Sequence, residues 1–191
     1  IYLFIMAISL LTSCREQAVT IAYQGANLSK EAQIIRDKET KKATLRIETK
    51  GKWQLFGGLS VETIDLSKPL LTGEGGGVFP LAVPPARFYF LLETETGRAI
   101  LSDRHLPMEG GFNFRDLGGI CNREGRYVKW GKLIRSDELH GLTDADLDYL
   151  SSIPTTTIVD FRSEEEIEAS ADRMPDNLKQ RFDFSMNPGN M

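Results

Sequence analysis

Two short stretches of the chain place charged side chains directly beside apolar ones. They are residues 113–119 (NFRDLGG) and residues 159–163 (VDFRS), and the second carries Asp160 and Arg162. A guanidinium fork can bind a phosphate through two parallel hydrogen bonds, and a neighbouring carboxylate can hold that fork in position. From spacing alone, the simpler interpretation is an arginine–aspartate pair that ties loops together without any ligand. Both interpretations stay open at this level.

The elements around Asp160 and Arg162 are typical of an α/β sheet. Residues 156–161 (TTIVDF) are β-branched and apolar, which predicts a central parallel strand that ends beside both charged residues. Ligands of open α/β sheets sit beyond the carboxyl ends of such strands. Capping boxes at Thr143 with Asp146 and at Ser163 with Glu166 predict two helices. After residue 107 the chain therefore alternates between strand and helix, as an α/β fold does.

The earlier part of the chain reads as antiparallel strands. From 18 to 103, short alternating segments are separated by Gly, Lys and Thr turns, which predicts a small all-β sandwich. One hairpin is expected across Lys50–Gly51, and a second is expected between residues 87–95 and 98–102. The glycine run 73–77 predicts a flexible loop and no phosphate cradle, because no Lys-Ser/Thr and no helix follow it. We place the domains at 18–103 and 108–191.

Four segments, in order, resemble the N-terminal half of a bacterial tyrosine-phosphatase family. They are residues 113–119, 125–136 (GRYVKWGKLIRS), 142–146 (LTDAD) and 159–166 (VDFRSEEE), so the resemblance covers about 110 to 175. The family includes secreted protein-tyrosine and phosphoinositide phosphatases. The resemblance implies the first half of an α/β phosphatase domain, and a phosphorylated protein or a small or lipid phosphate as substrate.

The resemblance also implies a mechanism without a metal or another cofactor. In the family a cysteine thiolate, held in a His-Cys-x5-Arg loop, attacks the phosphate ester and forms a cysteinyl-phosphate intermediate. The same resemblance assigns Arg115, Asp116, Asp160 and Arg162 to shaping the phosphate site. The sequence contains no His-Cys-x5-Arg loop, so the nucleophile is expected downstream of residue 191. The chain as given is expected to be inactive.

Cys121 is the other thiol to weigh as a nucleophile. Four residues, instead of five, separate it from Arg126, and Ile120 stands where the family has histidine. The anionic Glu124 would also oppose a phosphate. We interpret Cys121 as a structural residue. The two histidines lie too far from cysteines or acidic clusters to predict a metal site.

The N-terminal residues resemble a lipoprotein signal. Residues 1–11 are apolar but shorter than the roughly 20 residues that a membrane-spanning helix needs. Residues 11–14 (LTSC) resemble a lipobox, so Cys14 is expected to carry the lipid, with 1–14 as the signal segment. This predicts a protein anchored to a membrane of the cell envelope. The alternative is an edge strand with an incidental cysteine. The chain begins with Ile1 and shows no stop signal, so we expect a piece of a longer protein.

Composition and charge exclude one class of partner. The chain has 191 residues, of which 41% are hydrophobic and 26% charged, with a net charge of −4. Residues 104–191 hold 11 Lys and Arg against 16 Asp and Glu. Binding to nucleic acid depends on basic side chains that neutralise phosphates, so an acidic second half argues against it.

A second function stays open. The chain could be a non-catalytic surface lipoprotein that binds a protein or a glycan through its β-domain. Trp53, Phe56 and Tyr89 would then form the contact patch, although aromatic residues at strand spacing more often belong to a core. The sequence beyond residue 191 separates the two functions, because an intact His-Cys-x5-Arg motif supports the enzyme.

Overall fold

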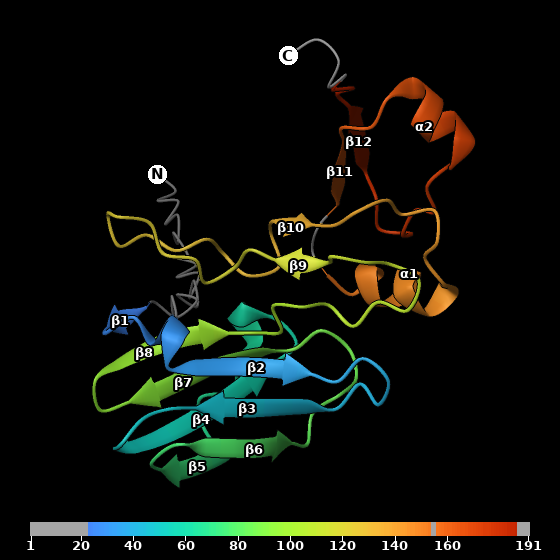
Figure 1. The fold of residues 1–191 in the computed structure, drawn as a ribbon. Helices are drawn as coiled ribbons and strands as arrows, with labels where there is room; N and C mark the ends of the chain where they lie inside the picture. The colour runs from blue at the N-terminus through green and yellow to red at the C-terminus, as the bar shows by residue number, and fades with distance from the viewer. Residues whose placement is uncertain (1–22, 154–155, 187–191) are drawn as a thin grey trace, which may run out of the picture.

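Two antiparallel sheets face each other across an apolar core in the first half of the chain. The structure, a computed structural model, describes residues 23–153 and 156–186. One sheet has the strand order β1-β8-β7-β4-β5, and the facing sheet has the order β2-β3-β6 (Figure 1). The elements are β1 (Gln24–Gly25), η1 (Leu28–Lys30), β2 (Ala32–Arg36), β3 (Ala43–Ile47), β4 (Lys52–Gly58), η2 (Val61–Thr63), β5 (Leu71–Glu74), β6 (Gly77–Leu81), β7 (Tyr89–Thr94) and β8 (Gly97–Leu101).

Strand periodicity explains this core. Successive side chains of a strand point to opposite faces, so Phe90 and Leu92 of β7 enter the space between the sheets. Tyr89 and Leu91 point to the outer face, where they pack with Trp130 from the second half of the chain. The five-stranded sheet is therefore covered on both faces. The predicted β-rich character of this region is confirmed.

One predicted hairpin is confirmed and the other is wrong. β7 and β8 pair antiparallel, with Phe90 opposite Leu101. β3, however, pairs with β2 and β6, whereas β4 pairs with β5 and β7. Residues 48–51 thus carry the chain from one sheet to the other. Leu45 and Leu55 are both fully buried in the shared core, and alternation alone does not distinguish facing strands from paired ones.

The glycine run 73–77 is also not the predicted loop. Gly73 lies in β5 and Gly77 in β6, so only a short turn separates the two strands. The indole of Trp53 lies against Gly73, where a Cβ atom would approach the ring to 2.3 Å. The indole N–H donates to the carbonyl of Gly75 at 2.9 Å. Gly73 is therefore needed for the packing of Trp53, whereas Gly75 serves the turn through its positive φ of 75°.

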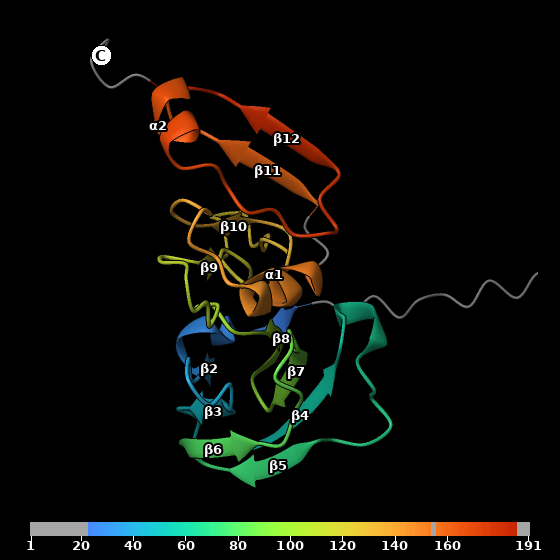
Figure 2. The ribbon, with the colours of Figure 1, turned by 90° about the vertical axis from the view of Figure 1, so that its right-hand side faces the viewer.

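The second half of the chain extends away from the sandwich in two tiers (Figures 1 and 2). A short ribbon and a helix lie next to the sandwich, and a parallel strand pair with a helix lies beyond them. Among the described residues, no helix is long and apolar enough to cross a membrane. The elements are β9 (Arg115–Asp116), β10 (Ile134–Arg135), α1 (Asp144–Ser151), β11 (Thr157–Asp160), α2 (Glu164–Ala169) and β12 (Gln180–Asp183).

The predicted helix starts are confirmed. Thr143 and Asp146 form a capping box at α1, and Ser163 and Glu166 form one at α2. β11 pairs in parallel with β12, as a strand–helix–strand unit requires. β11 is not the buried central strand that was expected. It has one partner strand within the described residues, and Val159 is 46% exposed. The described chain is thus mainly β, without the layered α/β half.

A buried ion pair joins the sandwich to the second half of the chain. The guanidinium of Arg87, which precedes β7, contacts the carboxylate of Asp116 in β9, and both side chains are fully buried. Arg87 also donates to the carbonyl of Asp103 at 2.6 Å. The carboxylate of Asp116 accepts the backbone N–H groups of Gly118 and Gly131, each at 2.7 Å. Every oxygen of this carboxylate therefore has a partner.

Neighbouring groups favour the charged form of Arg87. Burial works against the charge of Arg87, but the carboxylates of Asp116 and Asp103 outweigh it and raise the pKa of Arg87. Asp103 is itself bound by Arg36, whose Nε lies 2.8 Å away. Burial raises the pKa of Tyr149 in α1 to about 12, so its hydroxyl stays protonated and donates to Asp103 at 3.3 Å. The predicted boundary between 103 and 108 stays a prediction, since buried contacts continue across it.

The aromatic contact patch of the non-catalytic alternative is wrong. Trp53 and Tyr89 are each 2% exposed and Phe56 is 5% exposed. Trp53 belongs to the core between the sheets, and the other two pack under Trp130. Side chains that fill a core cannot form a contact surface for a partner.

We expect Arg87→Met to lower the free energy of unfolding by about 3 kcal/mol or more, because it leaves the Asp116 carboxylate buried without its cation. Arg98→Met is the matched control. Arg98 lies in β8 and pairs with Glu93, but their side chains are 32% and 30% exposed, so a loss below about 1 kcal/mol is expected. Urea unfolding followed by tryptophan fluorescence measures both. Equal losses for the two variants would contradict the role given to this pair.

Candidate functional site

A groove of about 830 Å³ separates the β9–β10 ribbon from the β11–β12 pair. Phe114 and Ile134 line its near wall, and Ile158 and Leu178 line the far wall. Charged residues also line it, among them Arg135, Asp160 and Arg162. An apolar cleft with a few charged groups is the usual form of a ligand site. We therefore treat this groove as the candidate functional site.

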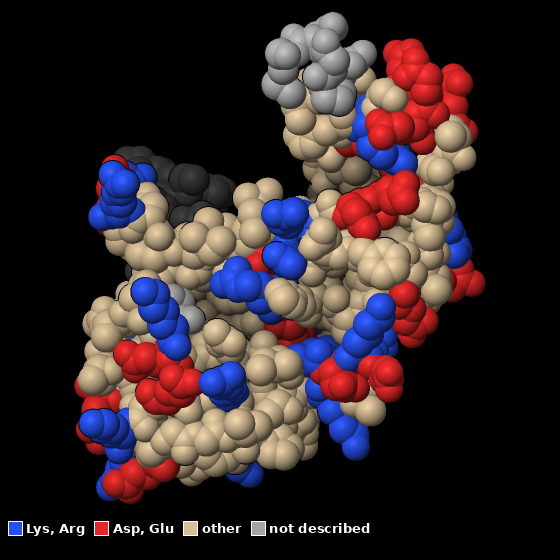
Figure 3. Space-filling view, viewed as in Figure 1, with Lys and Arg blue, Asp and Glu red and all other residues tan. Residues whose placement is uncertain are grey.

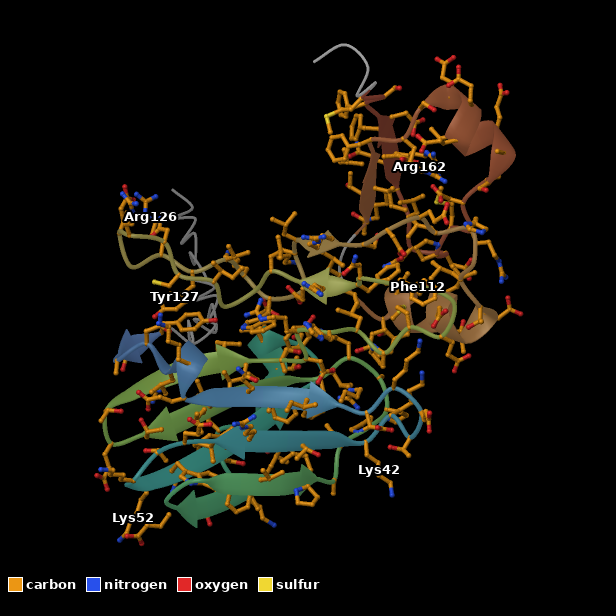
Figure 4. The ribbon with its side chains drawn as sticks, in the orientation of Figure 1. Lys42, Lys52, Phe112, Arg126, Tyr127 and Arg162 are labelled. Atoms are coloured by element: carbon orange, nitrogen blue, oxygen red, sulfur yellow. The ribbon has the colours of Figure 1, made fainter. Side chains whose placement is uncertain are left out.

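Arg162 and Asp160 meet at the end of β11, as the sequence predicts. Arg162 Nη2 lies 2.9 Å from Asp160 Oδ2, and Nε reaches both oxygens of the same carboxylate at 3.1 and 3.2 Å. Figure 4 shows Arg162 in the outermost tier, between the strand pair and α2. Asp172 binds the same guanidinium at 2.7 Å. These four contacts hold the Arg162 side chain in a fixed position.

A second arginine completes this cluster. Arg181 of β12 lies 2.9 Å from Asp160 and 3.2 Å from Asp172. Arg162 also donates to the carbonyl of Ser170 at 3.0 Å, and Glu138 stands 3.9 Å away. Most donors of Arg162 are therefore already used. In this arrangement the two arginines tie β11, β12 and the segment after α2 together, and the carboxylates offset their charge.

The hydrogen bonds lower the pKa of Asp160. The side chain of Arg162 is the main cause, and burial opposes it. The charged partners in turn raise the pKa of Arg162, again mainly through its hydrogen bond to Asp160. Both groups are therefore held in their charged forms. A fixed cation of this kind positions the neighbouring backbone more than it binds an incoming phosphate.

The other two predicted site residues lie outside the groove lining. Asp116 is fully buried and binds Arg87, so it can act only by positioning the 113–119 segment. Arg115 is its exposed neighbour and pairs in register with Arg135. Asp160 and Arg162 thus come together, whereas Arg115 and Asp116 point to opposite faces of β9. A role of these four residues in shaping a phosphate site stays a prediction.

Cys121 is not set up as a nucleophile. It is half-buried and lies opposite Tyr127 in an isolated bridge. The side chain of Asn122 accepts the backbone N–H groups of Glu124 and Arg126 at 3.0 and 2.8 Å. Those N–H groups therefore close a turn and do not surround the sulfur. Within residues 23–153 and 156–186 no group of three or more metal-ligating side chains occurs. Cys14 lies outside the described residues.

Sequence reasoning missed several charged residues that organise this region. Asp172 and Arg181 bind Asp160 and Arg162 but lie after α2, where no motif marks them. Arg87 belongs to the sandwich, and no motif marks it either. Arginines are rarely fully buried, so its sequence position gave no reason to expect a buried one. Arg135 does lie in the 125–136 segment, but the sequence gives no sign that it lines the groove or pairs in register with Arg115.

Comparisons with known proteins point to one family for this part of the chain. Residues 106–187 match the family model described as the tyrosine phosphatase family. A curated protein of Cupriavidus necator, provisionally named a tyrosine-protein phosphatase, is 39% identical over 66 residues. The match covers 34% of this chain and 24% of that relative. The chain therefore spans about a quarter of the curated relative that it matches. The family resemblance of the four ordered segments is thereby confirmed.

We expect the carboxyl of Asp160 to titrate below 3.8, its ordinary pKa, and to move up toward that value in Arg162→Gln. The charged form of Asp160 is favoured by folding, so its contribution to stability is present above pH about 4 and is lost as the pH falls through the lowered pKa. Carboxyl carbon shifts in NMR measure both values.

Asp65 is the control in the same spectra. Its pKa is also lowered, through the hydroxyl and backbone N–H of Ser67, so it should not respond to Arg162→Gln. If the pKa of Asp160 has its ordinary value in the parent chain, or does not change in Arg162→Gln, the proposed stabilisation of its carboxylate by Arg162 is refuted.

Proposed function

We propose that this protein hydrolyses phosphate monoesters with a cysteine nucleophile, and that residues 106–187 form part of its catalytic domain. The observation that carries the proposal is the match of these residues to the tyrosine phosphatase family. The groove supports it, because an apolar cleft beside fixed charges suits an aromatic or lipid phosphate ester. The substrate is a phosphorylated protein or a small or lipid phosphate.

We further propose that β11 and β12 are the first strands of a larger α/β sheet. Parallel sheets are normally buried on both faces. Here Val159, Phe161 and Phe182 are 46%, 53% and 44% exposed. These side chains need a cover of strands and helices, and the chain spans only 24% of the relative that it matches. In this proposal, residues beyond 191 supply the cover.

The proposed reaction takes place in two steps. The thiolate attacks phosphorus and forms a sulfur–phosphorus bond, while the ester oxygen leaves with a proton from an acid residue. Water then cleaves that bond and releases inorganic phosphate and the thiolate. No residue of 1–191 stands in a His-Cys-x5-Arg loop, so the nucleophile belongs to the proposed downstream part.

The described residues have a supporting role in this chemistry. Asp160 and Arg162 fix the carboxyl end of β11, where loops of an α/β sheet meet the ligand. Asp116 fixes the 113–119 segment through Arg87. These contacts keep the wall of the groove rigid, and a rigid wall lets the phosphate-binding loop dock in one position.

We expect the chain of 191 residues to leave p-nitrophenyl phosphate unhydrolysed, since it holds no phosphate-binding loop. The gene product that includes the downstream residues should turn over with a kcat of roughly 1–1000 per second, as enzymes typically do. Replacing the cysteine of its His-Cys-x5-Arg loop by serine should abolish the activity, whereas Cys121→Ser should not change it.

Absorbance of released p-nitrophenol measures the activity of these four proteins and of the 191-residue chain with Cys121→Ser. Hydrolysis by the 191-residue chain that Cys121→Ser removes would refute the assignment. So would a full gene product that lacks the loop.

We propose in addition that Cys14 carries a lipid that anchors the protein in the cell envelope. The support is the lipobox-like sequence LTSC at 11–14. Two or more acyl chains give stable anchoring. The complete gene product, expressed in a bacterium, should sediment with membranes, and Cys14→Ala should shift most of it to the soluble fraction. Immunoblots of the two fractions test this, and an unchanged distribution would rule the anchor out.

A further inference from the structure

Three basic side chains are aligned across adjacent strands of the middle tier. His105 forms an antiparallel bridge with Arg115, and Arg115 pairs in register with Arg135 of β10. We call His105, Arg115 and Arg135 the cation row. Figure 3 shows Lys and Arg side chains over β9 and β10 on the face in view. The alignment comes from backbone register, so neighbouring strands place these three residues side by side.

The pairing puts the cation row on one face. Side chains directly opposite in an antiparallel pair share a face. Leu106 N donates to Phe114 O at 3.1 Å and Asp116 N donates to Arg104 O at 2.9 Å. These two bonds flank His105 and Arg115 in the pattern of a narrow pair, whose Cα atoms lie about 4.5 Å apart.

The neighbours of the row in sequence lie on the other face. Arg104 lies over the ring of Trp130 at 5.1 Å from its centroid, and Asp116 is fully buried. The alternation along both strands thus agrees with the register. The register thus places the three basic residues on one exposed face of this ribbon.

The charge of the cation row is not balanced by the described chain. All three side chains are exposed, and within residues 23–153 and 156–186 none of them forms an ion pair or a side-chain hydrogen bond. Nearby arginines do have partners: Arg104 donates to two backbone carbonyls, and Arg162 pairs with two carboxylates. Like charges directly opposite in a sheet are destabilising. A bound anion would remove this repulsion.

We propose that the cation row binds a phosphate-type dianion. Adjacent strands lie about 4.8 Å apart, so the two guanidinium groups can converge on one tetrahedral group through charge-assisted hydrogen bonds. His105 adds a ring N–H in either charge state. Arg135 also lines the groove, so the site adjoins it. The family resemblance implies only a general phosphate-site role for Arg115; this inference adds His105 and Arg135, involves no nucleophile and holds for the described residues alone.

The test is a titration of the chain with inorganic phosphate at constant ionic strength, followed by backbone amide shifts in NMR. Saturable shifts are expected at residues 104–106, 115–116 and 134–135, with a Kd on the order of a few millimolar because the side chains are exposed. Arg115→Gln and Arg135→Gln should each weaken binding about fivefold. Absence of saturable shifts at these residues overturns the proposal.

Arg123→Gln is the matched control. Arg123 is also exposed, and the substitution removes the same charge, but Arg123 is not in register with another cation. It should leave the Kd unchanged, and an equal loss would show a general charge effect and overturn the site.

Thermal unfolding gives a second readout. Arg135→Gln removes repulsion, so its midpoint should equal or exceed that of the parent, and a clear fall would mean that Arg135 already has a partner.

Two sources could supply the phosphate group. Vesicles with a phosphate monoester headgroup, phosphatidic acid in phosphatidylcholine, are compared with pure phosphatidylcholine. Binding to the first alone, weakened by Arg115→Gln, assigns the site to a lipid headgroup. Binding of inorganic phosphate without vesicle binding assigns it to a soluble ligand. If inorganic phosphate gives no saturable shifts at the cation row, the proposal is overturned whatever the vesicles show.

Discussion

The buried ion pair of Arg87 and Asp116 is the constraint on which the arrangement of the two halves depends. A charged arginine in a core is tolerated only where a carboxylate meets it, and here that carboxylate comes from the other half of the chain. Because Asp116 also accepts the backbone N–H groups of Gly118 and Gly131, the pair holds the backbone at both of these positions. The sandwich is thus part of the support for the candidate site.

The two sets of arginines near the groove differ in how their charge is balanced. Arg162 and Arg181 share Asp160 and Asp172, so their donors serve the fold. Arg115 has no such partner among the described residues. Arginines of the same region therefore differ in role. Those that pair with carboxylates stabilise the fold, whereas those without such a partner are available to a ligand. Residue type in a motif does not carry this information.

Features set by neighbours in sequence could be predicted, and features set by distant contacts could not. The capping boxes at Thr143 and Ser163 and the β7–β8 hairpin depend on residues a few positions apart. The partners of β3 and β4 depend on the packing of two sheets, so alternation gave the wrong pairing. Asp160 and Arg162 were found because they lie two positions apart in the sequence. Arg87 and Asp116 are 29 positions apart, and no spacing rule links them.

The β11–β12 pair has a consequence for the behaviour of the chain in solution. Within the described residues each strand has one edge without a partner, and apolar side chains of both strands are exposed. Open edges of this kind accept strands from other molecules. Concentrated samples of the 191-residue chain would therefore self-associate through this tier, and the sandwich, whose aromatic side chains are buried, would take little part in that aggregation.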